Sequence, residues 1–333
     1  MPLFALAFPY LLAATLVASI IGIFIRRKLA VLMLICTLAG FYNITQIIAF
    51  NLPSKFITEK NNAALRIMTW NVQDFVDLTA KTSTSQKMLQ LIAAQNPNII
   101  CMQELTNVEG GKRRISIRQK MDSMGYKYYF FSMDEHITNK AGTSVITRGC
   151  AIFSKQPFID SNRIFINRDE LNVDEHLIYV DIHFNNQPLR IFTAHLASFA
   201  LFKDTATLPN KDIYEITYNR KSTIQYKLRD VERIHSKEAS IIRNEISQAK
   251  KPVIYCGDMN TVATSYTYHF LKGGLQDAFL EKGCGIGATF YKIIPTLRID
   301  YVFADKHLKV EQCKVIKKKL SDHYPVVTDV TWK

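Results

Sequence analysis

Acidic, amide and imidazole side chains recur in this sequence where apolar, strand-like runs end. The set comprises Asn71, Glu104, His195, Asp258, Asn260, Asp322 and His323, with Asp300 inside a further strand-like run. Taken alone, each residue has a simpler role, since Asn and Asp suit turns and Ser and Asp suit helix N-caps. Gathered at one edge of a sheet, they would crowd like charges together, which gives a fold no advantage. Their joint recurrence therefore indicates a functional site.

The chemistry that these residue types favour is metal-assisted hydrolysis of a phosphoester. Carboxylates without cysteine ligands suit a hard divalent cation such as Mg²⁺ or Mn²⁺. Histidines suit a phosphoryl group, because charge builds on its non-bridging oxygens in the transition state. The sequence holds neither the HExxH spacing of zinc hydrolases nor a P-loop, which disfavours both of those classes.

The order of these motifs resembles the endonuclease/exonuclease/phosphatase superfamily. The matching segments are Trp70-Asn71, Gln103-Glu104, Gly149–Ser154, His195-Leu196, Gly257–Asn260, Arg298–Tyr301 and Ser321–Pro325. Together they span residues 65–332. Members of the superfamily include exonuclease III-type AP endonucleases, deoxyribonuclease I, inositol polyphosphate 5-phosphatases and neutral sphingomyelinases. The resemblance implies an α/β (α+β) fold, a four-layered sandwich of two packed mixed sheets with helices outside.

The resemblance also implies a metal site and a base. Glu104 would be the principal metal ligand, with Asn71 beside it contacting a metal-bound water or the phosphate. Asp322 would complete the environment of the metal, which is Mg²⁺ or Mn²⁺. Asp258 would orient or deprotonate the attacking water, which requires a carboxylate within hydrogen-bond reach of that water.

The remaining residues would contact the phosphoryl group. Asn260 and His195 would donate hydrogen bonds to it, and Asp300 would fix the tautomer of His323 so that His323 stabilises the developing charge. One departure is Gln73, which stands where nucleases of the exonuclease III type often carry an acidic residue. This departure argues against a second metal site and does not affect the prediction of the first.

The composition limits the classes of protein to which the chain can belong. Of its 333 residues 48% are hydrophobic and 13 are glycine, which excludes disordered and collagen-like chains. There are 42 basic and 29 acidic residues, a net charge of +13, so an anionic partner is expected. Charge alone does not distinguish a nucleic acid from a lipid headgroup.

Residues 1–52 predict a two-helix transmembrane hairpin. Pro2 to Ile25 and Leu29 to Leu52 are two uncharged runs of 24 residues, and roughly 20 apolar residues cross a bilayer as a helix. The alternatives are buried core helices or a cleaved signal peptide. A signal peptide would carry its basic residues before the apolar run, whereas the triplet Arg26-Arg27-Lys28 follows it.

The basic triplet also predicts the orientation of the hairpin. The positive-inside rule keeps the turn that holds Arg26-Arg27-Lys28 in the cytoplasm and places the N-terminus and residues 53–333 outside. Lys55, Lys60 and Arg66 beyond the second span argue for the opposite orientation. We therefore expect a two-pass membrane protein with an extracytoplasmic catalytic domain.

The rest of the chain reads as a polar linker, residues 53–64, followed by one catalytic domain, residues 65–333. Expected strands are Leu65–Trp70, Asn98–Met102, Tyr126–Phe131, Ser144–Phe153, Leu177–Phe184, Leu189–Ala194, Pro252–Cys256, Arg298–Phe303, Leu308–Ile316 and Val326–Thr331. Expected helices are Ser85–Gln95, Lys112–Met124, Ser265–Leu271 and a long one within Tyr218–Ala249. Many of the strands are apolar throughout, which predicts sheets covered by helices.

The substrate is less determined than the chemistry. Specificity is expected in the segments between motifs, Ala197–Lys251 and the basic Gly110–Gln119. One hypothesis is a membrane-anchored phosphodiesterase or phosphatase acting on a headgroup near the bilayer, because tethering favours a substrate in the membrane plane. The alternatives are a tethered nuclease with a nucleic acid substrate and a non-catalytic binding module on the same fold. The sequence indicates no obligate protein partner.

Overall fold

The computed structural model describes residues 2–75, 84–110, 117–138, 144–168, 174–198 and 224–333. The helices are α1 (Pro2–Ile25), α2 (Arg27–Ala39), α3 (Phe41–Ile47), α4 (Thr84–Gln95), α5 (Ile117–Ser123), α7 (Ile224–Gln248), α8 (Tyr266–Lys272) and α9 (Ala278–Lys282). Long strands are β2 (Leu65–Asp74), β3 (Ile99–Gly110), β6 (Ser144–Ser154), β7 (Phe158–Arg168), β8 (Asp174–Phe184), β9 (Gln187–His195), β10 (Val253–Asp258), β14 (Leu308–Val315) and β15 (Val326–Trp332). Shorter ones are β1 (Ala49–Phe50), β4 (Tyr128–Phe131), β5 (Glu135–Thr138), β11 (Gln276–Asp277), β12 (Cys284–Gly285) and β13 (Asp300–Ala304).

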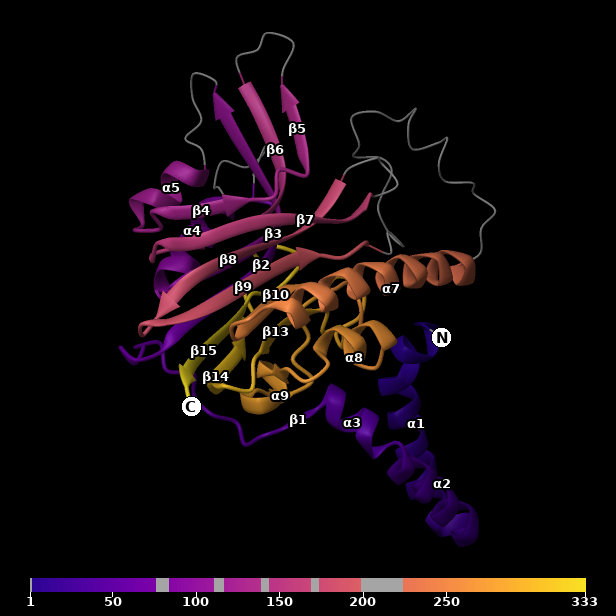
Figure 1. The fold of residues 1–333 in the computed structure, drawn as a ribbon. Coiled ribbons are helices and arrows are strands. Elements are labelled where there is room, and N and C mark those ends of the chain that lie inside the picture. The colour runs from indigo at the N-terminus through magenta and orange to yellow at the C-terminus, as the bar shows by residue number, and fades with distance from the viewer. Residues whose placement is uncertain (1, 76–83, 111–116, 139–143, 169–173, 199–223) are drawn as a thin grey trace.

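Two mixed sheets pack face to face, with helices on their outer faces (Figure 1). One sheet has the order β11-β13-β10-β9-β8-β7, and the other has the order β14-β15-β2-β3-β6-β4, with β5 paired to β6. Within them β9 runs parallel to β10 and β2 runs parallel to β3. The α/β architecture expected from the sequence is thus confirmed at the level of two mixed sheets covered by helices.

The burial of β10 explains why its sequence is apolar on both faces. Ile254 and Cys256 belong to the core between the two sheets, whereas Val253 and Tyr255 pack in the core beneath α7 and α8. A strand that is covered on both faces has no polar side, so its residues read as a continuous apolar run. The third core, under α4 and α5, includes Met88 and Met121.

The sequence pattern predicted most of the long strands and missed one long strand at an edge, together with the short strands β1, β5, β11 and β12. All ten expected strands are present, but β3 continues to Gly110, beyond the expected Met102, and the expected Arg298–Phe303 begins later, at Asp300. The missed long strand is β7, whose Asp160, Ser161 and Asn162 break the apolar pattern. Because β7 is the last strand of its sheet and pairs only with β8, polar residues there are tolerated. The expected helices Lys112–Met124 and Tyr218–Ala249 each begin outside the described residues.

The expected second membrane span, Leu29–Leu52, is wrong as one continuous helix. The segment divides into α2 and α3 at Gly40, and the two helices meet at an angle of 57°. It then enters β1, where Ala49 and Phe50 pair with Gly285 and Cys284 of β12. Within the described part of the chain, one helix, Phe4–Ile25, is by itself long and apolar enough to cross a membrane. The helices α2 and α3 pass the same test of length and apolar composition only when they are taken together as a bent pair.

A buried ion pair joins the neighbouring strands β2 and β15, which lie near opposite ends of the amino-acid sequence. Arg66 of β2 and Asp329 of β15 are register partners, and Arg66 Nε lies 2.6 Å from Asp329 Oδ1. The guanidinium also donates to the carbonyl oxygens of Ile57, Thr58 and Gln95. Arg66 is completely buried, so each of these hydrogen bonds that is lost would leave a buried polar group without its partner.

We expect Arg66→Met to destabilise the protein by about 3–5 kcal/mol, because Asp329 would remain buried without its cationic partner. The measurement is the free energy of unfolding of the detergent-solubilised full chain by denaturant titration. Lys127→Ala is the matched control, since the Lys127–Asp122 pair at 3.2 Å is exposed on both sides. Equal effects of the two substitutions would contradict the assigned role of the buried pair.

Candidate active site

The strand directions bring the chemically active residues to one edge of the sandwich. In one sheet His195 at the end of β9, Asp258 at the end of β10 and Asp300 at the start of β13 are register neighbours. Because β13 runs antiparallel to β10, its first residue lies beside the last residue of β10. Asn71 and Glu104 come from the parallel strands β2 and β3 of the other sheet. The two sheets therefore meet at this edge through polar side chains.

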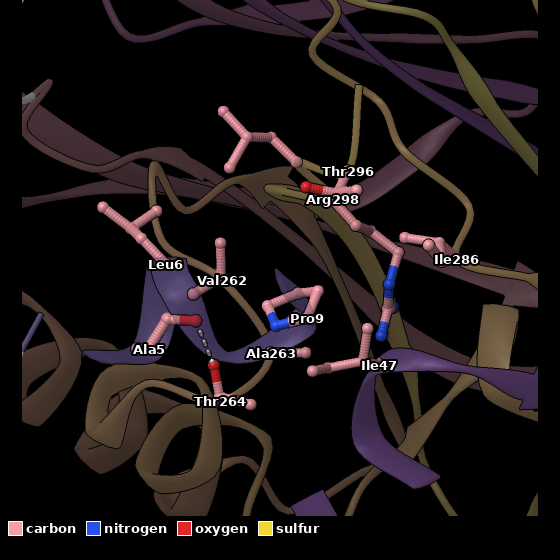
Figure 2. Close-up of a pocket in the computed structure, with 11 residues that line it drawn as sticks. Ala5, Leu6, Pro9, Ile47, Val262, Ala263, Thr264, Ile286, Thr296 and Arg298 are labelled. Carbon is pink, nitrogen blue, oxygen red and sulfur yellow. Dashed lines mark hydrogen bonds between the residues drawn. The ribbon is translucent and has the colours of Figure 1, made fainter. Parts of the chain in front are cut away.

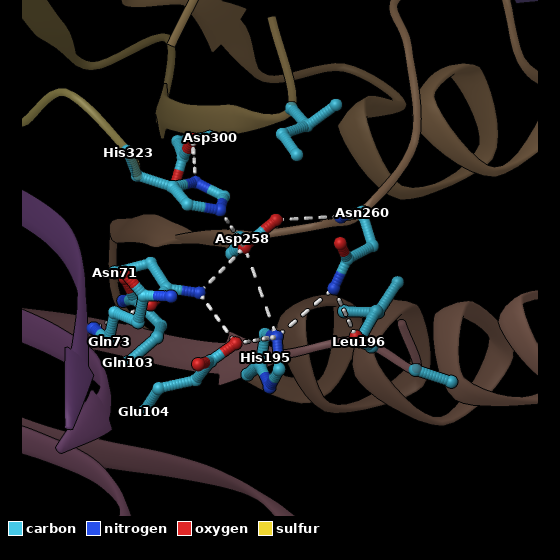
Figure 3. A network of polar contacts seen from close by, with 12 residues as sticks. Asn71, Gln73, Gln103, Glu104, His195, Leu196, Asp258, Asn260, Asp300 and His323 are labelled. Atoms are coloured by element: carbon cyan, nitrogen blue, oxygen red, sulfur yellow. Dashed lines mark hydrogen bonds and ion pairs between the residues drawn. The ribbon is translucent and has the colours of Figure 1, made fainter. Parts of the chain in front are cut away.

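Asp258 lies at the centre of the network, as Figure 3 shows. Its Oδ2 atom accepts a hydrogen bond from Asn71 Nδ2 at 3.0 Å and lies 3.6 Å from His323 Nε2 and 3.9 Å from His195 Nε2. Its Oδ1 atom accepts the backbone N–H of Asn260 at 2.8 Å. The side chain is completely buried, so these partners replace the water that it loses on folding.

His323 is fixed between two carboxylates and an aromatic ring. Its Nδ1 atom lies 2.8 Å from Asp300 Oδ2, and Nε2 faces Asp258. The Phe290 ring packs on the imidazole with a centroid distance of 4.8 Å. Trp70 Nε1 donates to the backbone oxygen of His323 at 3.0 Å. The ring is thus placed by a carboxylate at each nitrogen, Asp300 at Nδ1 and Asp258 at Nε2.

The electrostatics of this group follow from its burial. Burial disfavours the charged form of His323, yet Asp300 and Asp258 outweigh it and raise the pKa of His323 to about 10. Burial and the neighbouring Asp300 raise the pKa of Asp258 to about 6, although His323, His195 and Asn71 act in the opposite direction. A cationic imidazole between two buried carboxylates is the arrangement that results. Such a cation faces the charge of an anionic phosphoryl group favourably.

Glu104 is placed by an irregularity in β3. The pairing of β3 with β6 shifts between Met102 and Leu105, and Glu104 adopts a left-handed conformation with φ of 50°. Such bulges redirect a side chain out of the regular alternation. Glu104 Oε1 accepts Asn71 Nδ2 at 3.0 Å and lies 3.4 Å from His195 Nε2, with 38% of the side chain exposed. It is the most accessible carboxylate of the network in Figure 3.

Asn260 joins the two sides of the site. Its Nδ2 atom donates to the backbone oxygen of Leu196 at 2.8 Å and lies 3.0 Å from His195 Nε2. The residue has φ of 48°, a conformation that asparagine tolerates better than most residues. The turn after β10 therefore aims the amide at the segment that follows β9.

The residues that would hold a metal are not identical to the tightest acidic cluster. Among the described residues, ligand atoms of Asp258, Asp300 and His323 lie within 4.8 Å of one another. The imidazole of His323 contacts both carboxylates and, when protonated, offsets one of their two negative charges, so this trio already contains its own cation. Burial and the negative charge of Glu104 both raise the pKa of Asp322. Two carboxylates that repel each other across an accessible space, with no thiol beside them, fit a hard divalent cation.

All eight sequence-predicted site residues lie at this edge. Asn71, Glu104, His195, Asp258 and Asn260 form one connected network, and Asp300 joins it through His323 (Figure 3). Asp322 accepts a hydrogen bond from Ser321 Oγ and sits beside His323. Gln73 donates its N–H to Asn71 Oδ1, so the amide of Asn71 turns its nitrogen toward the carboxylates. Residues 111–116 of the basic segment Gly110–Gln119 and residues 199–223 of Ala197–Lys251 lie outside the described residues.

Sequence reasoning missed two supports of the site. Thr289 is completely buried, and its Oγ1 atom accepts the N–H groups of Ile299 and Asp300, both at 3.1 Å. Phe290, the next residue, covers the imidazole of His323. Neither residue lies in a regular element, so no periodic pattern marked them.

A buried pair on α7 supports the other side of the site. Glu238 accepts the backbone N–H of Ala197, and His235 Nε2 lies 2.7 Å from the Ala197 oxygen. Burial raises the pKa of Glu238 to about 7 and lowers that of His235 to about 4. Both side chains are completely buried, and the residue that they contact, Ala197, lies two residues after His195. The helix α7 therefore fixes the path of the chain where it leaves β9.

Comparison with known proteins agrees with this geometry. A family model described as "Endonuclease/Exonuclease/phosphatase family" matches residues 68–323. A search of curated protein sequences finds none that matches the chain. The family match spans the strands that carry every residue of the site.

Several solved structures share the fold. An endonuclease/exonuclease/phosphatase from Beutenbergia cavernae has a TM-score of 0.59 at 18% identity, over 81% of this chain and 72% of that one. D. rerio TDP2 complexed with a single-strand DNA product has a TM-score of 0.56 at 17% identity, over 81% and 100%. A mannosyl-6-phosphatase from Bacteroides thetaiotaomicron has a TM-score of 0.52 at 12% identity, over 80% and 100%. At these identities the likeness concerns the fold.

We expect Thr289→Val to destabilise the protein by about 1–3 kcal/mol, because two buried N–H groups would lose their acceptor while the side-chain volume stays the same. Thr289→Ser keeps the oxygen and should retain most of the stability. The measurement is the unfolding midpoint of both variants in the same detergent. A Val variant as stable as the Ser variant would show that the hydroxyl does not hold the start of β13.

Proposed function

The chain belongs to the endonuclease/exonuclease/phosphatase family, whose members are generally phosphoester hydrolases, and from this we propose that it hydrolyses a phosphoester at a membrane surface with a divalent metal. The observation that supports the proposal most is the environment of Asp258. A buried carboxylate lies between two imidazoles and two Asn residues, at an edge where Glu104 is accessible. This set combines a base, hydrogen-bond donors for a phosphoryl group and an oxygen ligand for a cation.

In the proposed reaction, water attacks phosphorus as the bond to the leaving oxygen breaks. Asp258 orients the water and accepts its proton, and the leaving oxygen takes a proton from solvent. His323, held by Asp300, stabilises the charge that develops on the non-bridging oxygens, while His195 and Asn260 donate hydrogen bonds from the other side. A bound Mg²⁺ or Mn²⁺, held by Glu104 and Asp322, would supply further positive charge to those oxygens, and Asn71 Nδ2 would hold Glu104 in place.

The N-terminal helix supports membrane anchoring. Phe4–Ile25 has a mean hydropathy of 2.2, and its apolar side chains are exposed, with Ile20 at 60% and Phe24 at 86%. A surface of this kind on a soluble protein would drive association, whereas lipid covers it at no cost. Anchoring in turn favours a substrate in the plane of the bilayer, such as a lipid headgroup ester.

A nuclease is the second candidate, and basic residues beside the site favour it. Lys317, Lys318 and Lys319 directly precede the Ser321-Asp322-His323 segment, and Lys319 Nζ lies over the Tyr291 ring. These basic residues would attract a polyanion such as DNA or RNA. The two candidates differ in salt dependence, since binding to DNA or RNA weakens steeply as counterions are added. Salt-sensitive cleavage of an oligonucleotide without hydrolysis of lipid esters would favour the nuclease.

We expect Asp258→Asn and His323→Ala each to lower kcat by about 10²–10³ on bis(p-nitrophenyl) phosphate, because each removes a group that acts in the transition state. The assay uses the full chain in detergent with Mg²⁺ or Mn²⁺. The matched controls are Asp305→Asn and His307→Ala, since this exposed pair has the same residue types 2.6 Å apart at the opposite end of β13. Normal turnover in either site variant would refute the assignment.

We expect Glu104→Gln to weaken Mn²⁺ binding by about tenfold or more, because the amide replaces the accessible charged ligand. Binding is followed by the electron paramagnetic resonance signal of free Mn²⁺, which does not depend on turnover. Glu311→Gln is the control, since that carboxylate pairs with Lys309 at 3.0 Å and with Thr331, on β14 and β15 rather than at the site. Equal Mn²⁺ affinities for the two variants would exclude Glu104 as a ligand.

A further inference from the structure

The N-terminal helix contacts two segments next to site residues, the one that follows Asn260 and the one that precedes Asp300. Thr264 Oγ1, four residues after Asn260, donates to the backbone oxygen of Ala5 at 3.0 Å. Tyr10 and Thr296 hydroxyls, the latter four residues before Asp300, lie 2.9 Å apart. Figure 2 shows the small cavity of about 20 Å³ at this seam, with Pro9 of α1 facing Ala263 and Arg298. Ala5, Pro9 and Tyr10 of α1 therefore contact the domain that follows the hairpin.

The second helical segment is docked as well. Arg298 is buried, pairs with Asp277 at 2.6 Å and donates to the backbone oxygen of Gln46 in α3 at 2.8 Å. Asn51 donates to the carbonyl oxygens of Leu280 and Gly283, both at 2.9 Å. The hairpin thus enters and leaves the domain through fixed contacts, and its two ends cannot move far from the active-site loops.

Docking shortens the part of the hairpin that is free to enter a bilayer. Beyond Tyr10, α1 continues from Leu11 to Ile25, 15 residues or about 22 Å at 1.5 Å per residue. The 13 residues of α2 extend about 20 Å. A bilayer has a hydrocarbon core of roughly 30 Å. The free hairpin, which projects from the domain in Figure 1, is therefore several ångströms too short to span it alone.

The charges at the tip of the hairpin set its depth. Arg26, Arg27 and Lys28 are exposed where α1 turns into α2, and charged side chains are costly inside hydrocarbon. They must reach the far headgroup layer, with their long side chains extending toward it. A hairpin that is too short can meet this requirement if its other end, the catalytic domain, is drawn into the near headgroup layer.

We propose that the surface beside α1, formed by Tyr42, Tyr266, Lys292 and Ile293, sits in the lipid headgroup layer and presents the active site to it. We call this surface the rim. The inference rests on the proposed membrane anchoring and phosphoester hydrolysis, and it assigns the substrate class as a phosphoester of a lipid in the same leaflet.

The composition of the rim suits a headgroup layer. Tyr42, Tyr266 and Ile293 are 62%, 63% and 42% exposed, and aromatic residues with a polar tip favour the membrane–water interface. Tyr42 stacks on His269 of α8 with a centroid distance of 5.8 Å, which ties α3 to α8. Lys292 adds a positive charge suited to lipid phosphates.

The rim is also continuous with the site. Lys292 follows Tyr291, whose hydroxyl donates to the backbone oxygen of Ser321 at 2.7 Å, next to Asp322. In the same loop, Tyr291 stacks on Tyr324 at 4.7 Å and Phe290 covers His323. Tyr266 follows Thr264 by two residues, on the side of Asn260. A headgroup at the rim is thus within one loop of the catalytic residues on either side.

The depth of the rim can be measured without turnover. Ile293→Trp in the full chain is reconstituted into phosphatidylcholine vesicles with acyl chains brominated near the headgroup. Ile159→Trp is the matched control, because Ile159 is 52% exposed and lies far from the site. It stands at the start of β7, and the pairing of β7 with β8 and of β8 with β9 places it at the end of the sheet opposite His195. We expect strong quenching at position 293 and little at position 159. Equally weak quenching at both positions would overturn the proposed docking.

A second measurement tests the consequence for catalysis. Ile293→Glu should lower hydrolysis of a phospholipid in the vesicles at least several-fold while leaving kcat on soluble bis(p-nitrophenyl) phosphate unchanged, and Ile159→Glu should change neither. Equal rates of the Ile293→Glu and wild-type chains on vesicle lipid would overturn the assigned substrate class. Absence of wild-type activity on the soluble ester would refute the proposed hydrolysis itself, whereas the quenching result would still report on docking.

Discussion

The burial of one carboxylate, Asp258, constrains the organisation of this site. A fully buried carboxylate is costly unless its lost water is replaced, and here the replacements come from distant segments of the chain. Asn71 reaches it from one sheet, His195 from the neighbouring strand of its own sheet, and His323 from the segment before β15. The edge can form only when both sheets have packed face to face. Assembly of the site and completion of the fold are therefore the same event.

Polar contacts beneath the site keep the two sheets in register. Gln103 is fully buried and donates from Nε2 to Thr69 of β2 at 3.1 Å and to Thr193 of β9 at 2.9 Å. Because β2 and β9 belong to different sheets, this side chain links the strands that carry Asn71 and His195. Glu104 and Asn260 adopt left-handed conformations, which typically cost of order 1–3 kcal/mol each. Packing of the sandwich maintains them, and they direct their side chains into the site.

The N-terminal hairpin combines an apolar composition with contacts to the rest of the chain. Its second segment is apolar enough to suggest a span, yet it divides at Gly40, and Arg298 donates to the backbone oxygen of Gln46 at its end. The buried ion pair of Arg298 with Asp277 lies two residues from Asp300, so the same loop contacts the N-terminal hairpin and the imidazole of His323. The position of the hairpin and the geometry of the candidate site therefore depend on shared contacts.

The sequence by itself determined the interior strands and the residues of the candidate site, because apolar runs and the polar residues at their ends are local patterns. The break at Gly40, the edge strand β7 and the supports Thr289 and Phe290 followed from contacts with segments far away in the chain, which no local pattern records. The family resemblance predicted the pairing of Asp300 with His323, and tertiary structure alone decided that Asp258 faces Asp300 across a strand pair and lies beside His323 Nε2. The physical reason is that a buried charge takes its partners from wherever the packed chain brings them, while hydrophobic periodicity reports only on a residue's nearest neighbours in sequence.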